Sequence, residues 1–166
     1  MSSERSEARA AGSPDFKDLL HAFSESGVKY LIVGAYAVAF YTEPRFTKDL
    51  DLWVEPTPEN AARVWKALAA FGAPVNDLSI ADLCNSELIF QVGVAPNRVD
   101  VLMGIEALAF PAAWRRKRRG TYLGVPVYFI GIEDLIRAKR AAGRLQDRLD
   151  VQRLLSSKRA RTVRRR

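Results

Sequence analysis

The stretch from Val33 to Glu55, "VGAYAVAFYTEPRFTKDLDLWVE", decides how this chain folds. It begins with an apolar residue and a glycine, and it ends with Asp49 and Asp51 in a segment that otherwise reads as a buried strand. Side chains alternate between the two faces of a strand, so the aspartates project to one side while Leu50 and Leu52 face the core. Two carboxylates held this close repel each other. A divalent cation such as Mg²⁺, which prefers carboxylate oxygens, would remove that repulsion.

A third isolated acid lies further along the chain, in "NRVDVLMG", where Val99 and Val101 flank Asp100. If this strand neighbours the strand that carries the aspartate pair, three carboxylates converge and can hold two metal ions. Paired metals suit in-line displacement at phosphorus, because they activate the attacking oxygen and neutralise charge on the phosphates. The alternative interpretation is a set of strand ends whose acids are simply hydrated.

Gly34 marks a place where a phosphate can bind. It follows a predicted strand and precedes a helix-compatible segment, so backbone N–H groups and the helix dipole can meet an anion there. The missing side chain also allows a close approach. A glycine at a strand end equally fits an ordinary turn. The combination of strand, glycine, helix and a second strand with Asp-x-Asp is what indicates a phosphate site.

Length and composition set wider limits. The chain has 166 residues, 48% of them hydrophobic, which suits one ordinary domain with its own core. It contains no run of the roughly 20 apolar residues that a membrane-spanning helix needs, so no membrane contact is expected. A single cysteine, Cys84, excludes an internal disulfide framework and fits a reducing cytoplasm. One His and one Cys also argue against a zinc site of the usual kind.

The net charge of +7 is concentrated in two basic runs. The tail Lys158–Arg166 carries six positive charges, and Arg115–Arg119, in "WRRKRR", carries five, so the rest of the chain is about −4. Either run is a candidate for contact with nucleic acid. The alternative for both is a solvated surface, and for the tail a disordered one.

The pattern of apolar residues and turn signals predicts an α+β (mixed α/β) fold with one sheet and helices packed on it. Residues 1–13 are expected to be disordered, residues 14–156 to form the domain, and residues 157–166 to form a basic disordered tail. Strands are predicted at 28–33, 49–54, 87–94, 98–105 and 122–130, with a hairpin at 95–97. Helices are predicted from Pro14, with Ser13 as N-cap, to Gly27, and at 35–42, 58–71, 132–142 and 146–157.

These motifs resemble the nucleotidyltransferase superfold, the DNA polymerase β-like family. Its pattern is an apolar residue, Gly, then Gly or Ser, a spacer, Asp-apolar-Asp-apolar, and a third acid in a later strand. Here Val33–Ala35 opens the pattern, thirteen residues follow, Asp49–Leu52 supplies the acidic pair, and Asp100 takes the third position. Ala35 stands where the family has Gly or Ser, so only its backbone N–H would contact a phosphate.

More narrowly, the chain resembles small bacterial nucleotidyltransferases related to the AbiEii toxin group, over about residues 15–155. "EPRFTKDLDL" is similar to the Arg-x-Thr-x-Asp-apolar-Asp motif of that group, and "LIRAKRAAGRLQDRLDVQRL" to its C-terminal Lys…Arg…Asp segment. Lys139 lies on the apolar face of a predicted helix, where it either snorkels to the edge or reaches a buried anion. The resemblance favours contact with the nucleotide or the acids. Arg45 and Lys48 are expected either to steady triphosphate charge or to be exposed loop charges.

The resemblance implies a nucleotidyltransferase that depends on Mg²⁺ or Mn²⁺. It would move a nucleoside monophosphate from an NTP to a hydroxyl of RNA, a protein or a small molecule. Asp49, Asp51 and Asp100 would hold the metal ions, and the backbone of Gly34 and Ala35 would receive the phosphates. Two alternatives stay open. One is a catalytically silent module that binds nucleic acid through its basic runs, and the other is an interaction protein such as an antitoxin.

Overall fold

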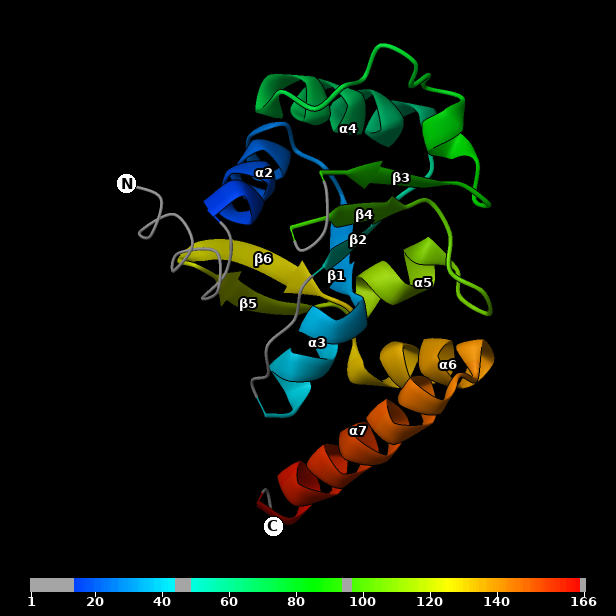
Figure 1. Ribbon diagram of the computed structural model, residues 1–166. Helices are drawn as coiled ribbons and strands as arrows, with labels where there is room; N and C mark the ends of the chain where they lie inside the picture. Colours follow the sequence, from blue (N-terminus) through cyan, green and yellow to red (C-terminus); the bar gives the residue numbers. More distant parts are fainter. Residues whose placement is uncertain (1–13, 44–48, 94–96, 165–166) are drawn as a thin grey trace.

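The computed structural model describes residues 14–43, 49–93 and 97–164, which form one mixed six-stranded sheet with helices packed on it (Figure 1). The predicted fold class is confirmed. The strands are β1 (Tyr30–Val33), β2 (Leu50–Val54), β3 (Ile89–Val92), β4 (Val99–Leu102), β5 (Arg118–Tyr122) and β6 (Val125–Phe129). The helices are α2 (Pro14–Glu25), α3 (Gly34–Tyr41), α4 (Pro58–Phe71), α5 (Phe110–Arg115), α6 (Ile132–Ala142) and α7 (Leu145–Arg164), with a short 3-10 helix at Asp82–Cys84.

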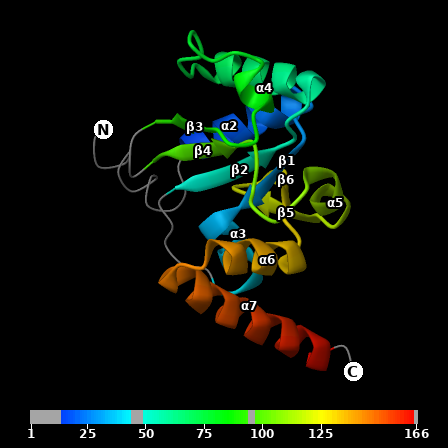
Figure 2. The same cartoon turned by 90° about the vertical axis from the view of Figure 1, so that its right-hand side faces the viewer.

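The sheet has the strand order β3-β4-β2-β1-β6-β5. Strands β1 and β2 pair antiparallel at its centre, β2 pairs parallel with β4, and β1 pairs parallel with β6. Helices α2 and α4 cover one face, while α3, α6 and α7 lie on the other side (Figures 1 and 2). Helix α5 contacts the same face as α3, because the rings of Phe110 and Trp53 pack edge to face at 5.1 Å. No helix in the described part of the chain has the length and apolarity needed to cross a bilayer.

Strand β2 has the alternation that its sequence predicts. Leu50 and Leu52 are fully buried, and Asp51 between them is partly exposed on the opposite face. Asp51 therefore faces the side of the sheet on which α3 and α5 lie. The predicted hairpin between residues 87 and 105 is also confirmed, since β3 and β4 pair antiparallel. Part of its turn, residues 94–96, lies outside the described residues, as do Ser13 and residues 1–12.

Two predicted helix boundaries depend on capping residues that the structure confirms. The Thr57 hydroxyl accepts a hydrogen bond from the backbone N–H of Asn60 at 3.3 Å, and Pro58 occupies the first turn of α4. Helix α6 ends at Gly143, which has a φ of 66°, a left-handed conformation that glycine adopts without steric cost. The turn at Gly143 matters for the site, because it folds α7 back against α6.

The region around residues 118–129 differs from the prediction. Instead of one strand there are two, β5 and β6, joined by a tight turn in which Leu123 and Gly124 both have positive φ values. Such a turn closes a two-residue hairpin. Strand β5 was missed because it is an edge strand with mostly exposed side chains, so it has no apolar pattern for sequence analysis to detect.

The basic C-terminal segment also differs from the expected disorder, because α7 continues as a helix to Arg164. Arg, Lys and Ala favour helix, and the segment has partners on α3 and α6. The Ser157 hydroxyl donates a hydrogen bond to the Tyr41 carbonyl, and the Arg161 guanidinium lies 5.3 Å from the Tyr41 ring. Lys158 pairs with Glu133. The correction applies to residues 157–164, because the last two residues lie outside the described part.

Much of the inner basic run is committed to the protein's own fold. Arg116 donates two hydrogen bonds, of 2.9 and 2.8 Å, to Asp134, whose side chain is completely buried in the first turn of α6. The ammonium of Lys117 lies 4.3 Å from the centre of the Trp114 ring. The run Arg115–Arg119 therefore has fewer charges available for nucleic acid than its sequence suggests.

We expect Arg116→Ala to lower the melting temperature clearly and Arg115→Ala to leave it nearly unchanged. Removing Arg116 leaves the buried Asp134 carboxylate without its bidentate partner and with only the longer contact of 3.9 Å to Arg137, and a poorly compensated buried charge is costly. The adjacent Arg115 is exposed and serves as a matched control. Thermal unfolding of the two variants measures the difference, and equal melting temperatures would show that the buried pair does not stabilise this fold.

Candidate functional site

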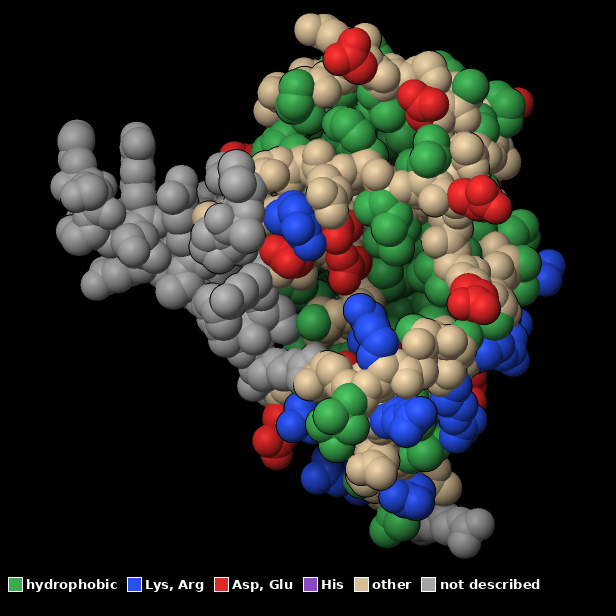
Figure 3. Space-filling view, turned by 45° about the vertical axis from the view of Figure 1, so that its right-hand side comes forward, with side chains coloured by type: hydrophobic (Ala, Val, Ile, Leu, Met, Phe, Trp, Pro, Cys, Tyr) green, Lys and Arg blue, Asp and Glu red, His purple; other side chains and the backbone are tan. Residues whose placement is uncertain are grey.

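The three predicted acids lie together on one face of the sheet. Asp51 on β2 stands directly opposite Asp100 on the parallel neighbour β4. Asp49 immediately precedes β2 and projects to the same side as Asp51. Figure 3 shows acidic side chains beside a hollow in the surface, with basic side chains on its rim. The sequence-based expectation that the two strands are neighbours is thus met by the strand register.

An arginine that sequence analysis did not select contacts two of these acids. The Arg98 Nη2 atom lies 3.4 Å from the Asp49 Oδ2 atom, and its Nε atom lies 3.1 Å from the Asp100 Oδ1 atom. Arg98 is two residues before Asp100, so both side chains project to one face of the strand. That spacing was the available signal in the sequence, although a basic residue at a strand end is too common to identify a site by itself.

The electrostatic environment of Asp51 is strongly perturbed. Its pKa is raised from 3.8 to about 7, first by burial and then by the negative charges of Asp100 and Asp49. Lys139 and Arg98 oppose the rise. A carboxyl group with such a pKa lies in a place where a further positive charge would be stabilising.

Gly34 is positioned directly against this carboxylate. Its φ is 66°, and a Cβ atom at this position would lie 2.1 Å from the Asp51 Oδ2 atom. Only glycine fits, both because of its conformation and because of this close approach. Gly34 begins α3, whose N-cap residue, Val33, provides no side-chain hydrogen bond. The first N–H groups of the helix, including that of Ala35, therefore remain for an anion beside the acids.

Lys139 reaches the site from α6, but its ammonium group is held by two acids of α7. The Nζ atom lies 3.2 Å from both the Asp147 Oδ1 atom and the Asp150 Oδ2 atom, and all three side chains are largely buried. Lys139 is nevertheless close enough to lower the pKa of Asp51. Of the two predicted alternatives for Lys139, the structure shows contact with a buried anion and not snorkelling. The anionic groups are the Asp147 and Asp150 carboxylates of α7.

Arg144, in the turn between α6 and α7, is exposed and yet held in a fixed orientation. Its Nε atom donates a hydrogen bond of 2.8 Å to Asp147, while 78% of its side chain stays accessible. Burial alone would raise the pKa of Asp147, but hydrogen bonds from Arg144 and Lys139 outweigh burial and hold this pKa below its ordinary value. The pKa of Arg144 is raised mainly by Asp147, and Asp51 adds to the rise. Arg144 thus joins Lys139 and Arg98 as a cation within electrostatic range of Asp51.

The donor atoms partly fit a hard divalent cation. All are carboxylate oxygens, and the Asp49 Oδ1 atom is buried without a hydrogen-bond partner in the described part of the chain. However, no three His, Cys, Asp or Glu side chains among the described residues are already arranged as a metal site. A cation would thus require small side-chain movements, including that of Arg98. Arg45 and Lys48, which were predicted to contact phosphates, lie outside the described residues.

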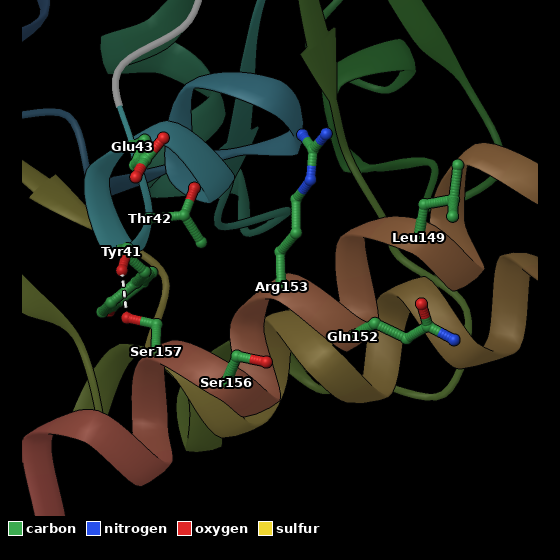
Figure 4. A pocket seen from close by; sticks show the side chains of 8 residues that line it. All are labelled: Tyr41, Thr42, Glu43, Leu149, Gln152, Arg153, Ser156 and Ser157. Atoms are coloured by element: carbon green, nitrogen blue, oxygen red, sulfur yellow. Dashed lines mark hydrogen bonds between the residues drawn. The ribbon is translucent and has the colours of Figure 1, made fainter.

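A separate groove of about 750 Å³ lies between the end of α3 and α7. Figure 4 shows Arg153 extending from α7 toward α3, and the hydrogen bond from Ser157 to Tyr41 at one end of the groove. Most of the residues that line it have polar side chains, and none of the three acids is among them. This groove was not predicted, because it depends on how α7 packs beside the end of α3, a tertiary contact that the local sequence pattern does not determine.

Comparison with known proteins identifies the fold. No protein-family model matches the chain, and no curated protein matches it. Among solved structures, the lincosamide antibiotic adenylyltransferase LnuA, with lincomycin bound, superimposes with a TM-score of 0.57 at 14% identity, over 86% of this chain and 96% of that one. A Thermotoga maritima protein, TM1012, provisionally assigned as a nucleotidyltransferase, gives a TM-score of 0.55 at 14% identity, over 85% and 90% of the two chains. The chain therefore has the nucleotidyltransferase fold.

The raised pKa of Asp51 predicts an unusual pH dependence of stability. Between pH 4 and 7 the folded protein holds a proton that the unfolded chain releases, so metal-free stability falls as pH rises, by at most about 1.4 kcal/mol per pH unit. Asp51→Asn removes this penalty. We expect the variant to be more stable than the wild type at pH 8 and the gap to close toward pH 4.

Denaturant unfolding in the presence of a chelator, at several pH values, measures this gap. Asp77→Asn, at an exposed acid outside the group, is the matched control and should show no such trend. A difference between Asp51→Asn and wild type that stays constant with pH would contradict the assigned electrostatics.

Proposed function

We propose that this protein is a Mg²⁺- or Mn²⁺-dependent nucleotidyltransferase that transfers a nucleoside monophosphate from an NTP to an acceptor hydroxyl. The observation that carries the proposal is the contact group formed by Gly34, Asp51 and Asp100. Asp51 stands opposite Asp100 in the strand register, and the missing side chain of Gly34 leaves room for the Asp51 carboxylate. The nucleotidyltransferase fold of the chain supports the same conclusion.

Asp49, Asp51 and Asp100 would hold the metal ions, which supply charge neutralisation for the phosphates and activation of the attacking oxygen. Asp100 would accept the proton of the acceptor hydroxyl. The acceptor oxygen then forms a bond to the α-phosphorus, and the bond from that phosphorus to the β-phosphate bridging oxygen breaks. Pyrophosphate leaves with the electron pair of that bond.

The triphosphate would bind between the start of α3 and the turn that joins α6 to α7. The N–H groups of Gly34 and Ala35 are donors at a helix N-terminus, where an anion is favoured. Lys139 and Arg144 would face the phosphates from the other side. Asp147 contacts both side chains, so their orientation costs little entropy when a nucleotide binds.

The acceptor can be RNA, a protein or a small molecule. LnuA, by its title an adenylyltransferase of lincosamide antibiotics with lincomycin bound, illustrates a small-molecule acceptor on this fold. The exposed charges of α7 favour RNA, because its six Lys and Arg side chains are all exposed and its two acids, Asp147 and Asp150, are buried. The narrower resemblance to the AbiEii-related group makes a cytoplasmic toxin–antitoxin component one form of this proposal.

The main alternative is a silent module with the same fold, which would bind nucleic acid or a partner protein without chemistry. The presence of all three acids close together argues for the enzyme, since a binding module gains nothing from three mutually repelling carboxylates. An antitoxin that covers a partner protein would differ from the enzyme because it would form a stable complex with that partner and transfer no nucleotide.

Transfer assays test the proposal directly. Incubation with each of the four labelled NTPs, cell extract and Mg²⁺ should label an acceptor, and Asp51→Asn should reduce labelling by about 100-fold or more, because a metal ligand contributes several kcal/mol to the transition state. Mg²⁺ should also raise the melting temperature more with the preferred NTP than alone. Asp77→Asn is the control. Wild-type transfer by Asp51→Asn would refute the assignment, and no NTP-dependent shift would favour the silent module.

The RNA acceptor is tested through the exposed cations of α7. Replacing Arg159 and Arg164 together by Gln should weaken RNA binding and flatten the dependence of log affinity on log salt, by about 0.7 for each lost phosphate contact. NTP binding should be unchanged, because both side chains are exposed on the last turns of α7 and are not among the groups that would hold the metal ions or the triphosphate. Filter binding at several salt concentrations measures the slope of log affinity against log salt for the wild type and for the variant. Identical slopes would exclude α7 as an RNA surface.

A further inference from the structure

Arg98 connects acids from two different strands of the candidate site. Its guanidinium contacts Asp49, just before β2, and Asp100 on β4, so it lies across the boundary between the two strands. The backbone is fixed there as well, because the N–H of Leu50 donates a hydrogen bond of 3.1 Å to the Arg98 carbonyl. The backbone from which the guanidinium extends is therefore held by the pairing of the two strands.

The geometry of these contacts is that of a weak counter-ion. The hydrogen bond from the Arg98 Nη2 atom to Asp49 is 3.4 Å long, whereas charge-assisted pairs of this kind usually measure about 2.7–2.9 Å. The Nε atom lies 3.1 Å from the Asp100 Oδ1 atom, but the two atoms are not oriented as a hydrogen bond. The side chain is 35% exposed, so it can swing into solvent at little cost.

The oxygens that Arg98 contacts belong to the carboxylates that would bind a divalent cation. A guanidinium and a metal ion cannot both occupy the contact shell of the same oxygens, and they repel each other at this distance. Asp51, the third acid, has no ion pair among the described side chains, and its charge is opposed only at longer range. Two of the three acids are therefore neutralised from within the chain.

We propose that Arg98 is a positioning residue that acts as an internal counter-cation, competing with the divalent cation for Asp49 and Asp100. The inference rests on the proposed function, because it assigns a further residue to the same site. Arg98 holds the two carboxylates in place on neighbouring strands and sets a threshold for metal binding. A metal ion must then either displace the guanidinium or bind through the carboxylate oxygens that Arg98 does not contact, such as the Asp49 Oδ1 atom, against the repulsion of the guanidinium charge.

The test is a Mn²⁺ titration of the metal-free full-length protein without nucleotide, followed by electron paramagnetic resonance. Arg98→Gln should bind Mn²⁺ more tightly than the wild type, by roughly fivefold, the scale of a partly exposed ion pair. Arg98→Lys keeps the positive charge and should bind with an affinity close to that of the wild type. Arg63→Gln, at an exposed arginine on α4 across the sheet, controls for the loss of overall charge.

The outcomes separate the two proposals. Equal or weaker Mn²⁺ binding by Arg98→Gln, while both proteins bind the metal and transfer nucleotide, would overturn the role of Arg98 and leave the proposed function intact. Absence of Mn²⁺ binding and transfer in every protein, wild type included, would overturn the metal-dependent function and the role of Arg98 with it. If Arg98→Gln fails to fold, Arg98→Met is titrated in its place with the same expectation, and if neither folds, Arg98 is a structural residue and the proposal fails.

Discussion

Repulsion between carboxylates across the pairing of β2 and β4 is the constraint on which the rest of this structure depends. Asp51 and Asp100 stand opposite each other in a parallel ladder, and burial of Asp51 makes their repulsion more costly than it would be in water. A fold that only needed a stable sheet would place apolar or neutral side chains there. The surrounding features, from the glycine against Asp51 to the cations at the rim, are most simply understood as responses to this cluster.

The positive charges that oppose the acidic cluster come from distant parts of the sequence, and those on α6 and in the turn after it are paired in turn with acids of α7. Lys139 opposes the charge of Asp51, but Asp147 and Asp150 hold it, and Arg144 in turn contacts Asp147. Positive and negative groups therefore alternate from the sheet to α7. Because Lys139 opposes the charge of Asp51 and is itself paired with Asp147 and Asp150, the α6–α7 pair is electrostatically part of the site, although its residues lie far from the acidic motif in sequence.

The sequence predicted the parts of the structure that depend on local pattern. The alternation in β2 put Asp51 and its neighbouring leucines on opposite faces, and a single acid in an apolar run located Asp100. Arg98 could not be selected in this way, because its importance lies in contacts between two strands and not in its local pattern. Strand β5 and the last turns of α7 were missed for a related reason. The polar sequence of each segment is compatible with several structures. Pairing with β6 makes the first segment a strand, and contacts with Tyr41 hold the second as a helix.

The parallel pairing of β2 with β4 has a consequence for how the protein folds. Asp51 and Asp100 are separated by 48 intervening residues, and Gly34 and Lys139 extend the site over more than a hundred positions of the chain. Contacts of such sequence separation form late, because a long loop must close before they are made. The local hairpins β3–β4 and β5–β6 can form without bringing the acids together. The electrostatic cost of the cluster therefore arises only when β2 pairs with β4, and neither hairpin carries it alone.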